Sequence, residues 1–482
     1  MTLSPTQSPN VEVAIIGGGF TGSMIAVNLL RLARERGQAP PSVALIEARD
    51  IAGPGLAYST PDVSHLLNVP AGRMSALASD PDHFVRWCLG RELAVTGGTF
   101  VSRGVFGQYL QDILREHAAS APSFRVINGH AIDLQSATGD LQRSIGPWRL
   151  AIAPDRRSKA TAELVAKRVV LALGNAPPCD FAWSRSLAPR TWIRDPWSAD
   201  ARRRVSELAV HDRVLIIGTG LTMMDLVLQL DSTGHRGSIA AISRRGLLSL
   251  PHRTLSKPYH RDRPGDLEFW PSTAIGYLRN LRRAVLEAAG KGVDWREVVT
   301  SIRQDTPALW KRLPLVEKQR FLRHLRPYWD THRHRAAPEV AAKIDELMRS
   351  GRLTIRPARV VDAEQLAGGA RLRIMPRGGR PDDVTTIDAD VVINCTGPET
   401  SPAGADDPLV HKLISTGIAR VDELALGLDS TPDYQVLTRS GKPAHGLLLV
   451  GPLQRPLHWE CVAVPELRVH AHRAAELLLL SE

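Results

Sequence analysis

One glycine pattern constrains the fold more than any other feature of the chain. Gly17, Gly19 and Gly22 follow the apolar, β-branched run Val11 to Ile16 and precede a stretch with helical periodicity, Ser23 to Arg34. In a strand, turn and helix, the first glycine permits the turn, the second lets a phosphate approach the backbone, and the third lets the helix pack on the strand. The pattern predicts a βαβ unit that holds a diphosphate at the start of its helix.

An acidic residue strengthens this interpretation. Ser42 to Glu47 reads as the next strand, and Glu47 lies 25 residues beyond Gly22 (47 − 22 = 25). A carboxylate there accepts hydrogen bonds from ribose hydroxyls. We expect an adenine dinucleotide at this turn, with contacts that include Phe20, Thr21 and Arg49. A purely structural glycine turn is the alternative.

The same pattern recurs 201 residues later (218 − 17 = 201). Arg213 to Ile217 reads as a strand, and it is followed by Gly218, Gly220, Leu221 and Thr222. The third glycine is replaced by methionine, so we expect this helix to lie further from its strand. The recurrence predicts a second dinucleotide-binding unit.

Two arginines stand where the first unit has its acid. Arg244 and Arg245 directly follow the expected strand Ser238 to Ser243. Guanidinium groups pair with a 2′-phosphate through charge-assisted bonds, which favours NADPH over NADH. The alternative is that both arginines are solvated loop charges.

Taken together, these motifs resemble the two-dinucleotide-binding flavoproteins. Within them, the chain is similar to the bacterial proteins commonly called FAD/NAD(P)-binding domain proteins, a group that includes an FAD-dependent urate hydroxylase. The resemblance spans most of the chain and is carried by the segments IIGGGFTG, GLAYST, HLLNVPAGRM, IIGTGLTMMD, INCTG and GPLQRPLHWECVAVPELR. It implies FAD at the first unit and a nicotinamide dinucleotide at the second.

The resemblance also implies further cofactor contacts. His65, Leu67, Asn68 and Met74 would lie near the isoalloxazine ring. Gly451 and Pro452 would hold the ribityl and phosphate region, and the helix starting near Val462 would direct its positive end at the flavin pyrimidine. The chain departs from the related sequences at Pro452, where wider flavoprotein families have aspartate, and at Pro456, where the group usually has glycine.

The 482 residues exceed the size at which one hydrophobic core stops growing. We expect an α/β fold with two Rossmann-like domains and a helical insertion. The FAD-binding domain is expected at residues 1–200 and 353–482. The NAD(P)-binding domain is expected at 201–352, with an Arg- and His-rich helical insertion at about 251–352. Gly174 and Gly397 end buried strands and are expected where the chain crosses between the domains.

Catalytic residues are less clearly marked. Trp459 and Glu460 precede the last helix, near the inferred flavin, where an acid orients substrate or moves a proton. Asn68 is a third candidate, and the alternative for Glu460 is a helix cap.

Composition excludes several other classes of protein. The net charge of +11 suits phosphate-bearing ligands, but there is no RRM, zinc-finger or helix-turn-helix signature, so nucleic acid is not an expected partner. The four cysteines form no CxxC pair, and the HxH pair His332 and His334 has no acidic or cysteine cluster beside it, so we expect no metal. The chain shows neither a secretory signal nor a membrane-spanning run, so cytoplasmic residence without membrane association is expected.

Three functions remain open. The first is an NADPH-dependent flavin monooxygenase that hydroxylates a small polar substrate with O2 through a C4a-peroxyflavin. The second is an NAD(P)H-dependent flavin reductase or dehydrogenase without oxygen insertion. The third is a dinucleotide-binding protein without catalytic activity. Neither the substrate nor the oligomeric state follows from the sequence.

Overall fold

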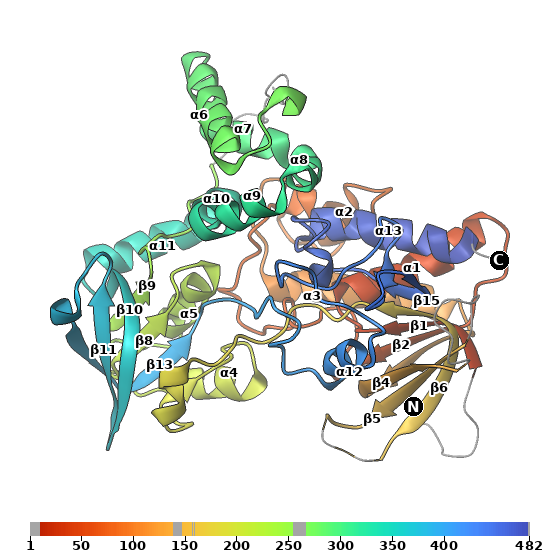
Figure 1. Ribbon diagram of the computed structural model, residues 1–482, viewed down its shortest axis with the longest axis horizontal. Coiled ribbons are helices and arrows are strands. Elements are labelled where there is room, and N and C mark those ends of the chain that lie inside the picture. Colours follow the sequence, from red (N-terminus) through yellow and green to blue (C-terminus); the bar gives the residue numbers. More distant parts are fainter. Residues whose placement is uncertain (1–9, 138–146, 157, 159, 254–266, 481–482) are drawn as a thin grey trace. The chain divides into compact units, whose positions relative to one another are not determined.

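A computed structural model describes residues 10–137, 147–156, 158, 160–253 and 267–480. Its contacts divide the chain into two compact units (Figure 1). Unit 1 holds the described residues up to Pro61, from Pro70 to Ala176, and from Glu399 onward. Unit 2 holds Asp62–Val69 and Pro177–Pro398.

The core of unit 1 is a mainly parallel sheet with the order β14-β15-β6-β1-β2-β3. The central strand β1 pairs in parallel with β2 and β6, and β4 and β5 extend the sheet through antiparallel pairing of β5 with β6. The central strands are almost wholly apolar and buried, as expected for a sheet covered on both faces. The strands are β1 (Asn10–Ile16), β2 (Val43–Glu47), β3 (Phe124–Asn128), β4 (His130–Ser136), β5 (Trp148–Ala153), β6 (Ala162–Leu171), β14 (Gln435–Leu437) and β15 (Pro443–Leu449).

Helix α1 follows β1 and lies in contact with the last helix, α13, and with α3 (Figure 1). Nearly every α1 residue from Phe20 to Ala33 is buried, because the helix is covered on more than one side. The helices of unit 1 are α1 (Phe20–Glu35), α2 (His83–Leu89), α3 (Arg103–Ala119), α12 (Pro408–Thr416) and α13 (Val464–Leu480).

Unit 2 has its own sheet, with the order β12-β11-β10-β9-β8-β13-β7. Neighbouring strands pair in parallel along β10, β9, β8, β13 and β7. Strands β10, β11 and β12 pair antiparallel and extend the sheet. The strands are β7 (Trp192–Ile193), β8 (Val214–Ile217), β9 (Ile239–Ser243), β10 (Leu353–Leu366), β11 (Gly369–Pro376), β12 (Thr385–Ala389) and β13 (Val391–Asn394). Helix α4 (Ala199–Ser206) precedes β8, and α5 (Leu221–Ser232) joins β8 to β9.

A helical insertion separates β9 from β10, and it includes the expected Arg- and His-rich helices. It is closed at its base by a parallel bridge between Pro251 and Ala336. Leu267, Trp270 and Ile302 form a small core of its own. The helices are α6 (Ala274–Gly290), α7 (Trp295–Ser301), α8 (Thr306–Arg312), α9 (Leu315–Arg320), a π-helical turn Phe321–Leu325, α10 (Arg326–Arg333) and α11 (Pro338–Arg349).

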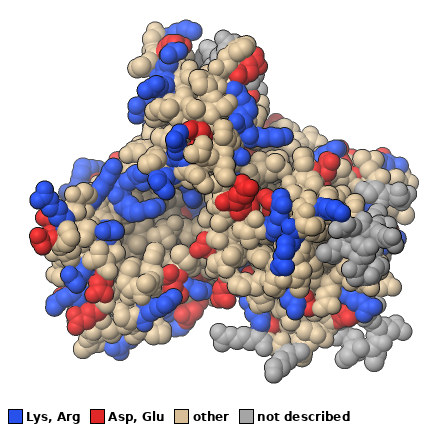
Figure 2. Space-filling model, in the orientation of Figure 1, with Lys and Arg blue, Asp and Glu red and all other residues tan. Residues whose placement is uncertain are grey.

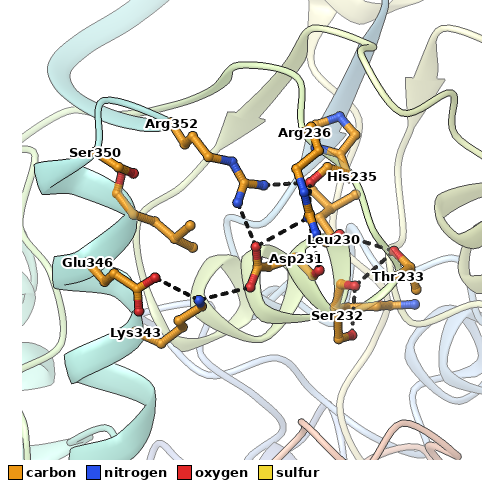
Figure 3. Close-up of polar contacts among 12 residues, drawn as sticks. Leu230, Asp231, Ser232, Thr233, His235, Arg236, Lys343, Glu346, Ser350 and Arg352 are labelled. Carbon is orange, nitrogen blue, oxygen red and sulfur yellow. Dashed lines mark hydrogen bonds and ion pairs between the residues drawn. The ribbon is translucent and has the colours of Figure 1, made fainter.

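An ion-pair cluster ties the end of this insertion to α5 (Figure 3). Asp231 of α5 contacts Lys343 of α11 at 3.1 Å and Arg352, just before β10, at 2.6 Å. Arg352 also donates to the carbonyl of His235 at 2.6 Å. Burial acts to raise the pKa of Asp231, but hydrogen bonds from Arg352 and Lys343 and their charges hold this pKa below its usual value. The three charged side chains therefore hold α11 and the residue before β10 against α5.

The bounds of the two units differ from the expected domains. Residues 353–398 lie in unit 2, because β10 pairs with β9 and β13 pairs with β8. Residues 177–200 also lie in unit 2, because β7 pairs with β13. The chain passes between the units after Ala176 and after Pro398. The first crossing follows Gly174, which has φ +75°, and the second follows Gly397, which has φ +89°. Both glycines were expected at these places.

Candidate functional site

The first glycine turn has no room for side chains at two positions. Gly17 has φ +102°, and a Cβ added there would lie 2.3 Å from the carbonyl oxygen of Ala172. A Cβ on Gly22 would lie 1.9 Å from the carbonyl oxygen of Gly17. The first glycine thus makes the turn and the third allows α1 to start close against it, as the spacing predicts.

The acid at the end of β2 is held against this turn. Glu47 is only 2% exposed. Its Oε2 accepts a hydrogen bond from the Gly18 backbone N–H at 2.8 Å, and its Oε1 accepts one from the Arg49 N–H at 2.9 Å. The carboxylate therefore stabilises this turn, and Arg49 Nη1 also donates to its Oε1 at 3.4 Å. The contact of Glu47 with a ribose stays a prediction.

The start of α1 suits an anion. Its N-cap is Gly19, which has no side chain to cap the helix, and its first turn contains no acidic residue. Gly451 lies beside this turn, because a Cβ added to it would be 3.7 Å from Thr21 Oγ1. Pro452 then opens a short 3-10 turn. Two segments predicted to contact one cofactor, more than 400 residues apart in sequence, are thus adjacent.

A residue that the sequence reasoning missed completes this cradle. Gly55 has φ +57°, and a Cβ added to it would be 2.9 Å from the Cα of Gly19. The loop after β2 therefore approaches the glycine turn at a point where only glycine fits. The run GPGLAY contains the signal, because a glycine with positive φ is typical of a close backbone approach.

The segment expected near the isoalloxazine is divided between the two units. His65, Leu67 and Asn68 belong to unit 2, whereas Met74 belongs to unit 1. His65 is buried, with its ring edge-on to Trp197 at a centroid distance of 5.5 Å. The Asn68 carbonyl oxygen is 2.9 Å from Nε2 of His252 in the insertion. The placement of this segment beside a flavin stays a prediction.

Trp459 and Glu460 are both buried in the loop before α13, at 6% and 2% exposure. The Arg455 guanidinium lies 5.5 Å from the Trp459 ring centroid. Because α13 begins at Val464, Glu460 stands three residues before the N-cap position (463 − 460 = 3), which argues against a capping role. A role in substrate chemistry stays a prediction.

Cys461 contacts the same loop through its thiol, which lies 3.3 Å from the Gly451 carbonyl oxygen. Burial raises the pKa of Cys461 to about 12. The thiol is therefore protonated at neutral pH and is a poor nucleophile.

The second glycine turn, in unit 2, repeats the geometry with one difference. Gly218 has φ +109°, and a Cβ on it would lie 2.3 Å from the Cys395 carbonyl oxygen. Gly220 caps α5, whose first turn has no acidic residue, and a Cβ on Gly220 would meet nothing within 4 Å. Met223 takes the place of the third glycine and is fully buried. The contacts predicted for Leu221 and Thr222 stay predictions.

Thr219 links this turn to the arginine pair, a role that the sequence reasoning missed. Its hydroxyl lies 2.9 Å from Ser243 Oγ and donates to the Leu247 carbonyl oxygen at 2.5 Å. Ser243 Oγ in turn accepts from the Gly246 N–H at 3.0 Å. The loop that carries Arg244 and Arg245 is therefore held against the second glycine turn.

Arg245 and a third arginine meet at one tyrosine. Hydrogen bonds from Arg377 and Arg245 lower the pKa of the Tyr328 phenol. The Arg245 guanidinium lies 5.6 Å from the Tyr328 ring centroid, and its Nη2 donates to the Arg323 carbonyl at 3.3 Å. Arg244 is exposed. Lys and Arg side chains gather on this part of unit 2, over α10 and α11 (Figure 2).

Two further features bear on the class of site. Within the described ranges, no group of three or more His, Cys, Asp or Glu side chains is placed to hold a metal ion. His332 instead lies edge-on to Trp295, with the ring centroids 5.0 Å apart. In the same part of the chain, every helix is too short or too polar to cross a membrane.

The fold and the two glycine turns define a two-dinucleotide-binding flavoprotein architecture. Residues 14–176 match the protein family described as FAD-NAD(P)-binding. No curated protein matches the chain.

Solved structures resemble the chain over nearly its full length. Ornithine hydroxylase from Pseudomonas aeruginosa, in its reduced form, has a TM-score of 0.65 at 16% identity, with 98% of this chain and 99% of that chain covered. Ornithine N-hydroxylase from Kutzneria sp. 744, with reduced FAD, NADP+ and L-ornithine, has a TM-score of 0.62 at 15% identity, with 98% and 99% covered. Bacillithiol disulfide reductase from Bacillus cereus has a TM-score of 0.55 at 14% identity, with 98% and 100% covered.

Proposed function

We propose that the protein is an FAD-dependent, NADPH-using monooxygenase that hydroxylates a small polar substrate. FAD binds at the first glycine turn, and NADPH binds at the second. The similar structures named as ornithine hydroxylases favour an amino group as the site of hydroxylation. The observation that carries the proposal is the pair of glycine turns, each at the uncapped start of a helix with no acid in its first turn.

The residues at the first turn fit FAD. The uncapped start of α1 stabilises the diphosphate, and Glu47 accepts from the ribose. Gly55 and Gly451 bring two further segments close to Gly19 and Thr21 without side chains of their own. When bound, the flavin supplies hydride acceptance and oxygen activation. The chain's task is to bind the two nucleotides, orient them and exclude water.

The second turn fits NADPH on the same grounds. The start of α5 receives the diphosphate, and Arg244 and Arg245 lie where the second strand ends, beside the position of a 2′-phosphate. Thr219 holds the loop that carries these arginines in place through a hydrogen bond to the Leu247 carbonyl.

A reductase without oxygen insertion is the second candidate, because a bacillithiol disulfide reductase shares the fold. The chain itself lacks a CxxC pair, and Cys395 and Cys461 are buried, with the pKa of each thiol raised by burial. A reductase would therefore pass electrons to its acceptor without the thiols of Cys395 and Cys461 as intermediates.

The test is to follow NADPH oxidation by the flavin-loaded protein across a panel of amines, amino acids and purines. A monooxygenase forms one hydroxylated product for each NADPH when the true substrate is present. Hydrogen peroxide formation with every compound, or electron transfer to a disulfide or quinone acceptor without oxygen, would support the reductase. A protein that binds no flavin and oxidises no NADPH would support a non-catalytic nucleotide-binding role.

A further inference from the structure

Three segments of unit 2 that are far apart in sequence meet at Tyr328. Arg245 follows β9, Arg377 follows β11, and Tyr328 lies in α10 of the helical insertion. The Arg245 guanidinium lies 5.6 Å from the Tyr328 ring centroid, and Arg377 and Arg245 both act to lower the pKa of the phenol. Tyr328 is 41% exposed, so a ligand in solution can reach it.

The backbone around this cluster holds the three segments in place. The Arg377 N–H donates to the Pro357 carbonyl at 2.8 Å, which fixes the end of β11 against β10. Gly246 packs on the same proline, because a Cβ added to it would lie 3.3 Å from Pro357 Cβ. Arg245 Nη2 also bonds the Arg323 carbonyl of the insertion. The cluster is thus a joint between the sheet and the insertion.

The charges at this joint exceed what a phenol can satisfy. Arg245 and Arg377 bring two positive charges, Arg244 is the neighbour of Arg245 in the sequence, and Tyr328 offers a single oxygen. The Arg245 Nε is buried, and it has no hydrogen-bond partner among the described residues. A phosphate monoester offers three acceptor oxygens and close to two negative charges, which suits planar guanidinium donors.

We infer that Arg377 and Tyr328 complete the binding site for the NADPH 2′-phosphate, so that this phosphate joins the helical insertion to the nucleotide-binding sheet. This inference rests on the proposed function, because it places NADPH at the second glycine turn. Arg245, after β9, and Arg377, after β11, bind the phosphate, and the Tyr328 hydroxyl of α10 donates a hydrogen bond to it. NADH has only an uncharged hydroxyl at this position, so only NADPH draws the insertion onto the sheet.

The first experiment measures nucleotide affinity by calorimetry for the full-length, flavin-loaded protein. Arg377→Ala and Tyr328→Phe should each weaken binding of NADPH and of 2′,5′-ADP roughly tenfold or more, as expected for a lost hydrogen bond to a charged phosphate. Binding of NADH and 5′-ADP should not change. Arg373→Ala is the matched control, because Arg373 lies on β11, the strand that Arg377 follows, and pairs with Asp362 at 3.9 Å.

The second experiment measures backbone amide exchange in α10. NADPH should slow exchange at residues 326–333, NADH should not, and Tyr328→Phe should remove the effect of NADPH. Phenylalanine keeps the ring that packs beside Arg245, so the helix is expected to fold in this variant.

The outcomes separate this inference from the proposed function. If the wild-type protein prefers NADPH, and Arg377→Ala binds NADPH as tightly as the Arg373→Ala control does, the inference is overturned and the proposed function stands. Equal losses of NADPH and NADH affinity in Arg377→Ala would also overturn it, since the residue would then support the fold and not bind the phosphate. A wild-type protein that binds neither NADPH nor 2′,5′-ADP would overturn both.

Discussion

Glu47 and Gly18 are joined by a hydrogen bond in which the carboxylate at the end of β2 accepts from the backbone N–H in the middle of the glycine turn, at 2.8 Å. The acid thus fixes the glycine turn, in addition to its proposed contact with the ribose. The bond is buried, so water does not replace it. A substitution at Glu47 should therefore affect flavin binding through two separate contacts.

Glu47→Ala should weaken FAD binding by roughly tenfold to a hundredfold, because a hydrogen bond to a charged group contributes about 1.5–3 kcal/mol. The measurement is the ratio of flavin to protein absorbance after purification, followed by titration of the apoprotein with FAD. Asp50→Ala is the control, since Asp50 is exposed three residues further on. Unchanged flavin content in Glu47→Ala would contradict the assignment of this turn to FAD.

The two glycine turns should respond differently to alanine. In Gly22→Ala, the new Cβ would lie 1.9 Å from the Gly17 carbonyl oxygen, so the helix must move, at a cost of about 3 kcal/mol or more in the free energy of unfolding. In Gly220→Ala, the Cβ meets nothing within 4 Å and φ is −85°, so the folded state should be unaffected.

Thermal unfolding and nucleotide titration check both parts of this prediction. Gly220→Ala should retain the wild-type unfolding temperature and bind NADPH less tightly, because the Cβ occupies space where the diphosphate approaches the backbone. Wild-type NADPH affinity in this variant would place the nucleotide elsewhere.

His470 should make the protein sensitive to mild acid. Its ring is packed 4.6 Å from that of His458, and its Nδ1 is 3.0 Å from the Tyr434 hydroxyl. Burial, with the neighbouring His458 charge, lowers the pKa of His470 from 6.5 to about 4. Between these two values the unfolded chain takes up a proton that the folded protein does not, so stability falls as the pH drops from about 6.5 to about 4.

Across this pH window, His470 alone should lower the free energy of unfolding by about 3 kcal/mol. Urea unfolding at several pH values should show a shallower acid dependence in His470→Gln than in wild type. Tyr434→Phe is the control, because it removes the hydrogen bond but leaves His470 buried. Identical slopes in wild type and His470→Gln would show that His470 is already protonated, or not buried, in the folded protein.

Asp231→Asn should destabilise unit 2 by about 1–3 kcal/mol, because it removes the charge that compensates Arg352 and Lys343 (Figure 3). Asp345→Asn, at an exposed position on α11, should change stability by less than about 0.5 kcal/mol. Chemical unfolding of the two variants under the same conditions measures the difference in their free energies of unfolding. Equal stabilities would mean that the cluster does not anchor the insertion.

The local elements followed from the sequence because their signals are local. The glycine spacing, the apolar run of β1 and the acid at Glu47 predicted the first turn, and its geometry has the close contacts at Gly17 and Gly22 that the spacing requires. The crossings after Gly174 and Gly397 could be predicted for the same reason.

Strand pairing could not be predicted in this way. Residues 353–366 join β9 rather than unit 1, because the pairing depends on which edge of a sheet is open once about a hundred residues of insertion have intervened. Tyr328 and Arg377 were missed as neighbours of Arg245 for the same reason, since nothing in their own segments indicates which partners the fold supplies. Gly55 did carry a local signal, and its role became clear only from its approach to Gly19.

The central claim is that FAD and NADPH bind at the two glycine turns and exchange electrons. The direct measurement is anaerobic mixing of the purified, flavin-loaded protein with NADPH or NADH while the flavin absorbance is followed. The account predicts a yellow protein that NADPH bleaches at lower concentrations than NADH, with this preference lost in an Arg244→Ala, Arg245→Ala double variant. A protein that neither retains nor takes up FAD, or whose flavin is not reduced by either nucleotide, would contradict it.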